Sequence, residues 1–141
     1  MQARRAELVD VLEGGSGLLA IDNSVPVGVV TWRIAGETAE VRSVAVSEPA
    51  RGRGVGRALM DAADTALRAA GVRRAWLVTT NDNLAALALY QQAGWRLAAL
   101  RPGGVDEARR VKPSIPEIGQ HGIPLRDELE LQLTLQARSA G

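Results

Sequence analysis

A glycine-rich basic loop, placed between an apolar strand and a long helix, is the part of the sequence best suited to chemistry. The loop follows Val44-Ala45-Val46 and a turn marked by Pro49. It consists of Arg51, Gly52, Arg53, Gly54, Val55, Gly56 and Arg57. Backbone N–H groups that begin a helix have no helical partner and lie at the positive end of its dipole. With three arginines beside them, they predict a site for a phosphate or pyrophosphate.

The spacing of the loop excludes two common phosphate-binding motifs. A P-loop requires a Gly-Lys pair, and the sequence contains none. The dinucleotide fingerprint G-x-G-x-x-G requires glycine where Arg57 stands, and an acidic residue at the end of the next strand, which closes at Thr79. The pattern that remains is Arg51-x-x-Gly54-x-Gly56, directly after the Val-Ala-Val strand. A phosphate-binding loop of another kind is therefore expected.

A second motif lies on a predicted helix further along the chain. Its residues are Asn83, Ala86, Leu89, Tyr90, Gly94 and Trp95. Asn83 can cap the helix, and Gly94 can end it in a left-handed conformation. In this order and separation, the two patterns resemble the R/Q-x-x-G-x-G/A loop and the N-x-x-A-x-x-L-Y-x-x-x-G-F/W element of the GNAT superfamily of N-acetyltransferases. The resemblance runs from Leu18 to Leu135. Taken alone, the first motif could be a surface loop without a ligand. Tyr90 alone could be an ordinary half-buried aromatic residue.

The resemblance implies direct transfer from acetyl-CoA and gives roles to residues of both motifs. The loop would hold the pyrophosphate. The strand before it would bulge and splay from the next parallel strand, so that the pantetheine arm pairs with Val44 and Val46. The Val44 N–H would face the thioester oxygen, and the Tyr90 phenol would protonate the leaving thiolate. The expected cofactor-binding residues are Val44, Ala45, Val46, Arg51, Gly52, Arg53, Gly54, Val55, Gly56, Arg57, Asn83 and Tyr90.

Glu40 is the leading candidate for the base that deprotonates the acceptor amine. It lies six residues before Val46, the spacing at which some superfamily members carry a glutamate base. Strand periodicity places it on the same face as Val44 and Val46. Two other interpretations stay open, because many members use a water chain and Glu40 could simply be a solvated residue paired with Arg42. Glu37, on the preceding turn, is a second candidate for the base, and Glu128 and Glu130 on the last strand could line the acceptor site.

Composition and charge fit a small enzyme. The 141 residues suffice for one domain, which we expect to span 1–141. With no cysteine and one histidine, neither a thiolate nor a multi-histidine metal site is expected. A net charge of +1 argues against nucleic-acid binding. No signal peptide or membrane-length apolar run is evident, so we expect a cytoplasmic protein.

Hydrophobic patterning predicts an α/β fold with a mixed sheet. The expected helices are Ala3 to Glu13, Gly54 to Ala70 and Leu84 to Ala93. The expected strands are Leu18 to Asp22, Val27 to Ile34, Thr38 to Val46, Arg74 to Thr79, Trp95 to Leu100 and Asp127 to Leu135. The last strand alternates cleanly, with its leucines directed inward.

Two departures from the family pattern bear on the acceptor site. Only seventeen residues precede Leu18, whereas family members carry further elements there that build one wall of the site. A shortened gene, a mis-assigned start or a partner subunit, and thus a homodimer, would each account for this. The connection from Arg101 to Arg126 is long and rich in proline and glycine, so it either shapes the substrate entrance or is a surface loop. His121 within it is expected to be exposed.

These inferences lead to one expected function and one alternative. We expect a GNAT-like fold with a shortened N-terminus and an acetyl-CoA-dependent N-acetyltransferase that acts on a primary amine of an unidentified acceptor. The alternative is a CoA- or acetyl-CoA-binding module without turnover, with a regulatory or partner role. Tyr90 and Glu40 favour the enzyme, and the short N-terminus favours the binding module.

Overall fold

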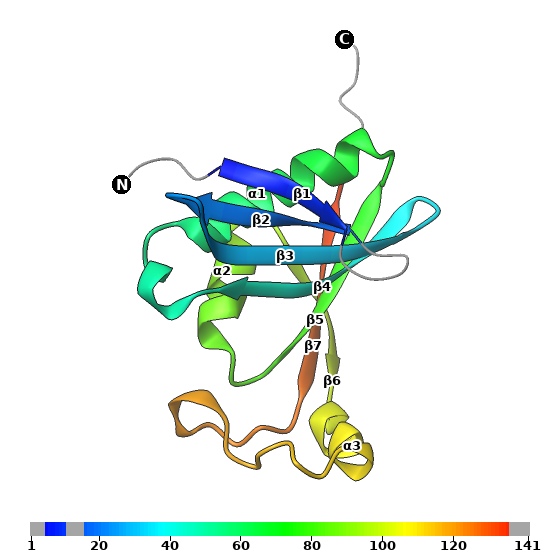
Figure 1. Cartoon of the computed structure of the whole chain (residues 1–141). Helices are drawn as coiled ribbons and strands as arrows, with labels where there is room; N and C mark the ends of the chain where they lie inside the picture. Colours follow the sequence, from blue (N-terminus) through cyan, green and yellow to red (C-terminus); the bar gives the residue numbers. More distant parts are fainter. Residues whose placement is uncertain (1–4, 11–15, 136–141) are drawn as a thin grey trace. The chain divides into compact units, whose positions relative to one another are not determined.

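The computed structural model describes residues 5–10 and 16–135, which fall into two compact units. The first unit comprises the chain up to Trp76 and the segment that begins at Leu133, and the second comprises Leu77–Gln132. Figure 1 labels the helices and strands of both. Strands β5 and β7 each contribute residues to both units.

The first unit is built on a run of antiparallel strands. They are β1 (Arg5–Asp10), β2 (Ser16–Asp22), β3 (Val25–Ala35) and β4 (Thr38–Val46). Each pairs with the next along the chain, and β4 also pairs in parallel with the first residues of β5 (Arg74–Thr80). The predicted hairpin between β2 and β3 is confirmed. Its turn residues Asn23 and Ser24 have φ values of 52° and 64°, as a tight two-residue hairpin requires.

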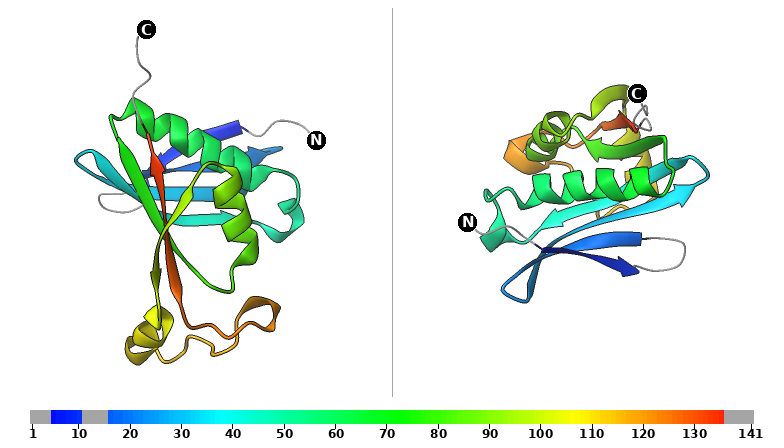
Figure 2. Two further views of the ribbon diagram at one scale, coloured as in Figure 1. Left: turned by 180° about the vertical axis from the view of Figure 1, so that it is seen from behind. Right: turned by 90° about the horizontal axis from the view of Figure 1, so that it is seen from above.

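Helix α1 (Val55–Ala69) packs on the sheet of this unit, as the view from above in Figure 2 shows. Apolar residues recur at helical spacing along one face, and the buried ones are Val55, Leu59, Met60, Ala63 and Leu67. Burying each leucine stabilises the fold by about 1.5–3 kcal/mol. The helix approaches β3 closely at Gly28, where a Cβ atom would lie 2.9 Å from Leu59 Cδ1. This packing fixes the N-terminal end of α1 beside the end of β4.

The second unit combines strands with two α-helices. They are α2 (Leu84–Gln92), β6 (Arg96–Arg101), α3 (Gly104–Val111) and β7 (Glu128–Thr134), with a short turn η2 at Gln120–Gly122. Strands β6 and β7 are antiparallel, so parallel and antiparallel pairs both occur and the predicted mixed α/β class is confirmed. No helix in the described ranges is long and apolar enough to cross a membrane.

The prediction of a helix from Ala3 to Glu13 is wrong. Residues Arg5–Asp10 form strand β1, and every one of them has a register partner on β2, from Arg5–Ile21 to Asp10–Ser16. Pairing with a neighbouring strand satisfies the backbone N–H and C=O groups of so short a segment, and it overrides a weak helical preference. The remaining residues of the predicted helix lie outside the described residues.

Candidate functional site

The loop between β4 and α1 presents the first turn of α1 without a side-chain cap. After β4 the chain makes a short 3-10 turn, η1 (Glu48–Ala50), and Gly54 then serves as the N-cap residue. Gly52 and Gly54 have φ values of 77° and 80°, a region that favours glycine. The helical ladder begins with Ala58 N–H donating to Gly54 C=O at 3.0 Å. The earlier N–H groups of the helix therefore have no partner within it, and helix N-termini of this kind can bind anions.

Two of the three loop arginines already have partners. Arg51 Nε donates to the Val46 carbonyl at 3.2 Å, which ties the loop back to the end of β4. Arg57 Nε lies 3.1 Å from Asp61 Oδ1, and both side chains are about half exposed. Because solvent screens such an exposed pair, its effect on stability is small. Arg53 is exposed. The loop is thus basic, but Arg57 shares its charge with a carboxylate.

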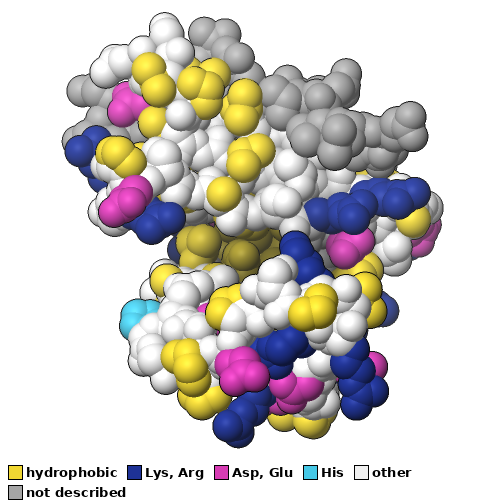
Figure 3. All heavy atoms as spheres, turned by 60° about the horizontal axis from the view of Figure 1, so that its bottom comes forward, with side chains coloured by type: hydrophobic (Ala, Val, Ile, Leu, Met, Phe, Trp, Pro, Cys, Tyr) yellow, Lys and Arg dark blue, Asp and Glu magenta, His cyan; other side chains and the backbone are white. Residues whose placement is uncertain are grey.

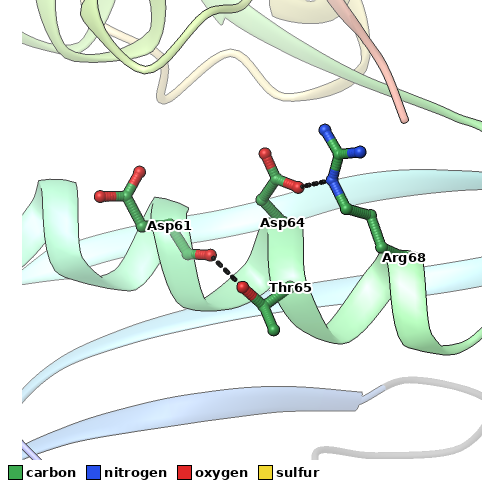
Figure 4. Close-up of a pocket in the computed structure, with 4 residues that line it drawn as sticks. All are labelled: Asp61, Asp64, Thr65 and Arg68. Carbon is green, nitrogen blue, oxygen red and sulfur yellow. Dashed lines mark hydrogen bonds and ion pairs between the residues drawn. The ribbon is translucent and has the colours of Figure 1, made fainter. Parts of the chain in front are cut away.

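A hollow along α1 differs in charge from this loop. It has a volume of about 380 Å³ and is lined by Asp61, Asp64, Thr65 and Arg68. Figure 4 shows Asp64 joined to Arg68 and the Thr65 hydroxyl bonded to the Asp61 carbonyl, at 3.2 Å. Each carboxylate of this wall has an arginine partner, Arg57 for Asp61 and Arg68 for Asp64, so the hollow lacks the excess of positive charge found at the loop.

Strand β4 changes its pairing halfway along its length. Its parallel register with β5 runs from Thr38–Arg74 to Glu40–Trp76. Beyond Glu40, the register partners of β4 in the described chain lie only on β3. A β-bulge accompanies the change, since Trp32 faces Val41 and Thr31 faces Ser43, which leaves Arg42 as the extra residue. The backbone groups of β4 that point away from β3 are therefore not used in a ladder over Val44–Val46.

The bulge overturns the prediction that Glu40 shares a face with Val44 and Val46. Those two valines face Val30 and Gly28 on β3, the face that packs on α1. Glu40 faces Arg33, which lies on the other side of the sheet by strand alternation. One inserted residue moves all later side chains to the opposite face. Glu40 is half-buried.

Helix α2 carries Tyr90 in the second unit and has a defined start and end. The Asn83 side chain accepts a hydrogen bond from Ala86 N–H at 3.3 Å, so the predicted cap is confirmed. Gly94 has a φ of 97°, and Trp95 N–H donates back to the Tyr90 carbonyl at 2.9 Å, which closes the helix in a Schellman motif. The Tyr90 and Trp95 rings lie 6.5 Å apart between centroids. Both ends of α2 therefore match the motif read from the sequence.

The Tyr90 phenol has the properties of a proton donor. The residue is 7% exposed, and burial raises the pKa of the phenol above its ordinary value of 10.0. No hydrogen bond joins the hydroxyl to another residue of the described chain. A buried hydroxyl without a protein partner is uncommon and marks a candidate functional group. At neutral pH the phenol is protonated.

The other residues named from the sequence have structural environments of their own. Glu130 forms an ion pair with Arg101 and accepts from Gln132 Nε2 at 2.8 Å. Glu37 is exposed on the β3–β4 turn, where its carbonyl accepts from Arg73 N–H at 2.7 Å. The single histidine, His121, is exposed, and Figure 3 shows it in cyan at the surface. None of these contacts places Glu37, His121 or Glu130 beside another candidate catalytic residue of its own unit.

The structure groups the candidate residues into two sets. The first unit holds Glu40, Val44–Val46 and Arg51–Arg57, and the second holds Asn83 and Tyr90. The sequence reading missed Asp82 and Arg109, which organise the segment between α3 and β7. Asp82 lies directly between the β5 strand and the Asn83 cap, and that position was the one available sign of its importance.

Comparison with known proteins gives the class to which this fold and site belong. Residues 2–95 match the model of the acetyltransferase (GNAT) family, and the chain belongs to that family. The Bacillus subtilis (strain 168) protein YxbD is 38% identical over 122 residues, which cover 86% of this chain and 75% of YxbD. YdhI from the same organism is 37% identical over 114 residues, which cover 80% of this chain and 70% of YdhI.

Solved structures agree with this assignment. A Bacillus subtilis acetyltransferase in complex with CoA matches with a TM-score of 0.83 and 23% identity, over 95% of this chain and all 100% of that chain. A GNAT family acetyltransferase from Elizabethkingia anophelis with acetyl-CoA bound matches with a TM-score of 0.75 and 26% identity, over 86% and 77% of the two chains. The predicted family and the GNAT-like fold are confirmed.

Proposed function

We propose that this protein transfers the acetyl group of acetyl-CoA directly to a primary amine. The observation that carries the proposal is the uncapped first turn of α1, preceded by Gly52 and Gly54 in left-handed conformations. Acetyl-CoA is the co-substrate that fits, because its pyrophosphate is an anion of the size and charge for this turn. Family membership and the CoA complexes of the structural relatives support the same ligand.

The part of β4 that does not pair with β5 supports a role in holding the thioester. Val44–Val46 have register partners on β3 and none on β5, so an extended pantetheine arm can pair with this edge as a further strand would. The Val44 N–H is the proposed donor to the thioester oxygen. Such a donor stabilises the negative charge that develops on that oxygen as the amine attacks.

The chemistry then requires two proton transfers. The amine nitrogen attacks the carbonyl carbon, a C–N bond forms, and the C–S bond to CoA breaks. The amine proton passes to a base, for which Glu40 or a water molecule is proposed. The leaving thiolate takes a proton from the Tyr90 phenol, which burial keeps protonated. The products are an acetylated amine and CoA.

An acceptor panel tests this function. Purified protein and acetyl-CoA are incubated with an aminoglycoside, a polyamine, an amino acid and a peptide with a free N-terminus and lysine, while thiol release is followed. One acceptor class should release thiol well above the uncatalysed rate and gain the mass of one acetyl group. If calorimetry detects acetyl-CoA binding but no acceptor in a broad panel reacts, the binding-module alternative is favoured.

A further inference from the structure

The turn between β5 and α2 binds a segment that lies some forty residues later. Asn81 Nδ2 donates to the Pro124 carbonyl at 2.8 Å, and its Oδ1 accepts from the N–H groups of Arg126 and Asp127 at 3.1 and 3.0 Å. The Asn81 N–H also donates to the Asp127 carbonyl at 3.0 Å. All of these partners are backbone groups, so the contacts fix the path of the chain before β7.

Asp82 contacts the same segment through a buried carboxylate. The residue is 4% exposed, its Oδ2 accepts from Gln120 N–H at 2.8 Å, and its Oδ1 accepts from the Thr80 hydroxyl at 2.5 Å. Gly119 lies so close that a Cβ atom there would be 2.2 Å from Asp82 Oδ2. Any residue other than glycine at 119 would therefore displace the turn from the carboxylate.

The Asp82 carboxylate is ionised at neutral pH. Burial alone would raise the pKa of this carboxyl. The hydrogen bonds from the Thr80 hydroxyl and the Gln120 N–H outweigh burial and, with the nearby His121, lower the pKa below its ordinary value of 3.8. Hydrogen bonds to a charged acceptor are stronger than those between neutral groups. The contact between Asp82 and the turn is thus a strong one.

The far side of the same segment is held by Arg109 on α3. Its Nε donates to the Ile115 carbonyl at 3.1 Å, and its Nη2 donates to the carbonyls of Pro116 and Leu125 at 2.9 and 2.8 Å. Leu125 N–H donates to the Glu117 carbonyl at 2.9 Å. The 117–127 segment is therefore a fixed part of the second unit, held by Arg109 on one side and by Asn81 and Asp82 on the other.

Helix α2 has little packing of its own to set its position. It has nine residues, and Tyr90 is its single buried residue. A helix this short is marginal without tertiary support. Gly94 and Trp95 close its C-terminal end, and its N-terminal end begins at the turn that contains Asn81, Asp82 and the Asn83 cap. A shift of the 117–127 segment would be passed to the start of α2.

The geometry assigns Asp82 the role of a positioning residue for acetyl transfer: it fixes the 117–127 segment to the start of α2 and thereby holds the Tyr90 phenol in place. This inference rests on the proposed role of Tyr90 as the acid. Displacing a catalytic group by about 1 Å can reduce the rate about a hundredfold, so the effect belongs in kcat.

Single substitutions at the contact between Asp82 and the 117–127 segment give the first test of the assignment. Asp82→Ala should lower kcat by about tenfold to a hundredfold and leave the Kd of acetyl-CoA within about threefold. Gly119→Ala disturbs the same contact from the other side, so it should also lower kcat and leave the Kd of acetyl-CoA nearly unchanged. Asp82→Asn, which keeps an acceptor for Gln120 N–H, should restore most of the rate. Glu107→Ala is the matched control, because it removes an exposed carboxylate of the same unit, 3.9 Å from Arg110.

Coupling to Tyr90 distinguishes positioning from a general loss of structure. If Asp82 acts through the phenol, Asp82→Ala should cost less than about twofold in a Tyr90→Phe background. If the reductions in kcat from the two changes multiply, or if folded Asp82→Ala is fully active, Asp82 is not a positioning residue. Either result leaves the acid role of Tyr90 intact. If Tyr90→Phe itself is as fast as the parent, the acid role fails, and the positioning role fails with it. Hydrogen exchange of the Gln120 amide reports whether the contact was broken in each variant.

Discussion

Replacement of Tyr90 by phenylalanine separates the chemical role of the phenol from the packing role of the ring. The ring lies against Trp95 and is buried, while the hydroxyl has no partner among the described residues. Removing this hydroxyl leaves no other group unsatisfied, so the free energy of unfolding should change by less than about 1 kcal/mol. Acetyl-CoA affinity should also be retained. A positioned general acid contributes roughly a hundredfold or more to the rate.

We therefore expect kcat of Tyr90→Phe to fall by about one to three orders of magnitude, which corresponds to about 1.4–4 kcal/mol of transition-state stabilisation. The assay is thiol release at saturating acetyl-CoA with an acceptor for which chemistry is rate-limiting. Gln91→Ala is the control on the same helix, because it removes only an exposed side-chain hydrogen bond to the Leu87 carbonyl, 3.0 Å long. An unchanged kcat in Tyr90→Phe under these conditions would refute the acid role.

Three further predictions concern the base, the buried carboxylate and assembly. Glu40→Gln should lower the rate most at neutral and lower pH, where the acceptor amine most needs to lose a proton; an unchanged pH–rate profile would favour a water chain. The stabilisation from Asp82 should be present above the unfolded-state pKa of 3.8 and disappear as the pH falls through the lower folded-state value. Urea unfolding should therefore show less stability lost on acidification in Asp82→Asn than in the parent. Light scattering should give a dimer mass if a partner subunit completes the acceptor site, and a monomer at high concentration would exclude this.

Local patterns in the sequence predicted the parts of the fold that local interactions determine. The apolar run and the helical spacing around the loop gave β4 with its observed bounds, Thr38–Val46, and α1 within one residue at each end, Val55–Ala69. The Asn83 cap and Gly94 likewise act within a few residues of their positions. These features depend on backbone preferences that a short stretch of sequence contains.

Features that depend on distant partners were not predicted from the residues of the segment itself. The segment Arg5–Asp10 is a strand because β2 lies beside it, and its own composition allows either structure. The family resemblance implied a bulge in this strand, but no glycine or proline marks its position at Arg42, and it reverses the face of Glu40 relative to Val44. Both errors come from treating a segment as if its neighbours in space did not matter.

The structure of the connection between β6 and β7 was also not predicted, although the sequence contains one indication of helix α3. Helix α3 begins with Asp106 and Glu107 and ends with Arg109 and Arg110, an order that complements the helix dipole. The contacts of Arg109 had no such sign, and Asp82 was marked only by its place before the Asn83 cap. Their partners in the 115–127 region are backbone N–H and C=O groups, which every residue type except proline provides in full.

Binding of acetyl-CoA to two matched glycine variants tests the central claim most directly. Gly54 and Gly36 have φ values of 80° and 63°, and at neither position does a Cβ atom meet another atom within 4 Å. Valine at either position therefore carries a similar backbone strain, of about 1–3 kcal/mol. Gly54 alone lies at the proposed pyrophosphate site. Calorimetry should show that Gly54→Val loses at least about tenfold in affinity, about 1.4 kcal/mol, while Gly36→Val binds like the parent. Equal affinity of the two folded variants would contradict the claim that the first turn of α1 holds the cofactor.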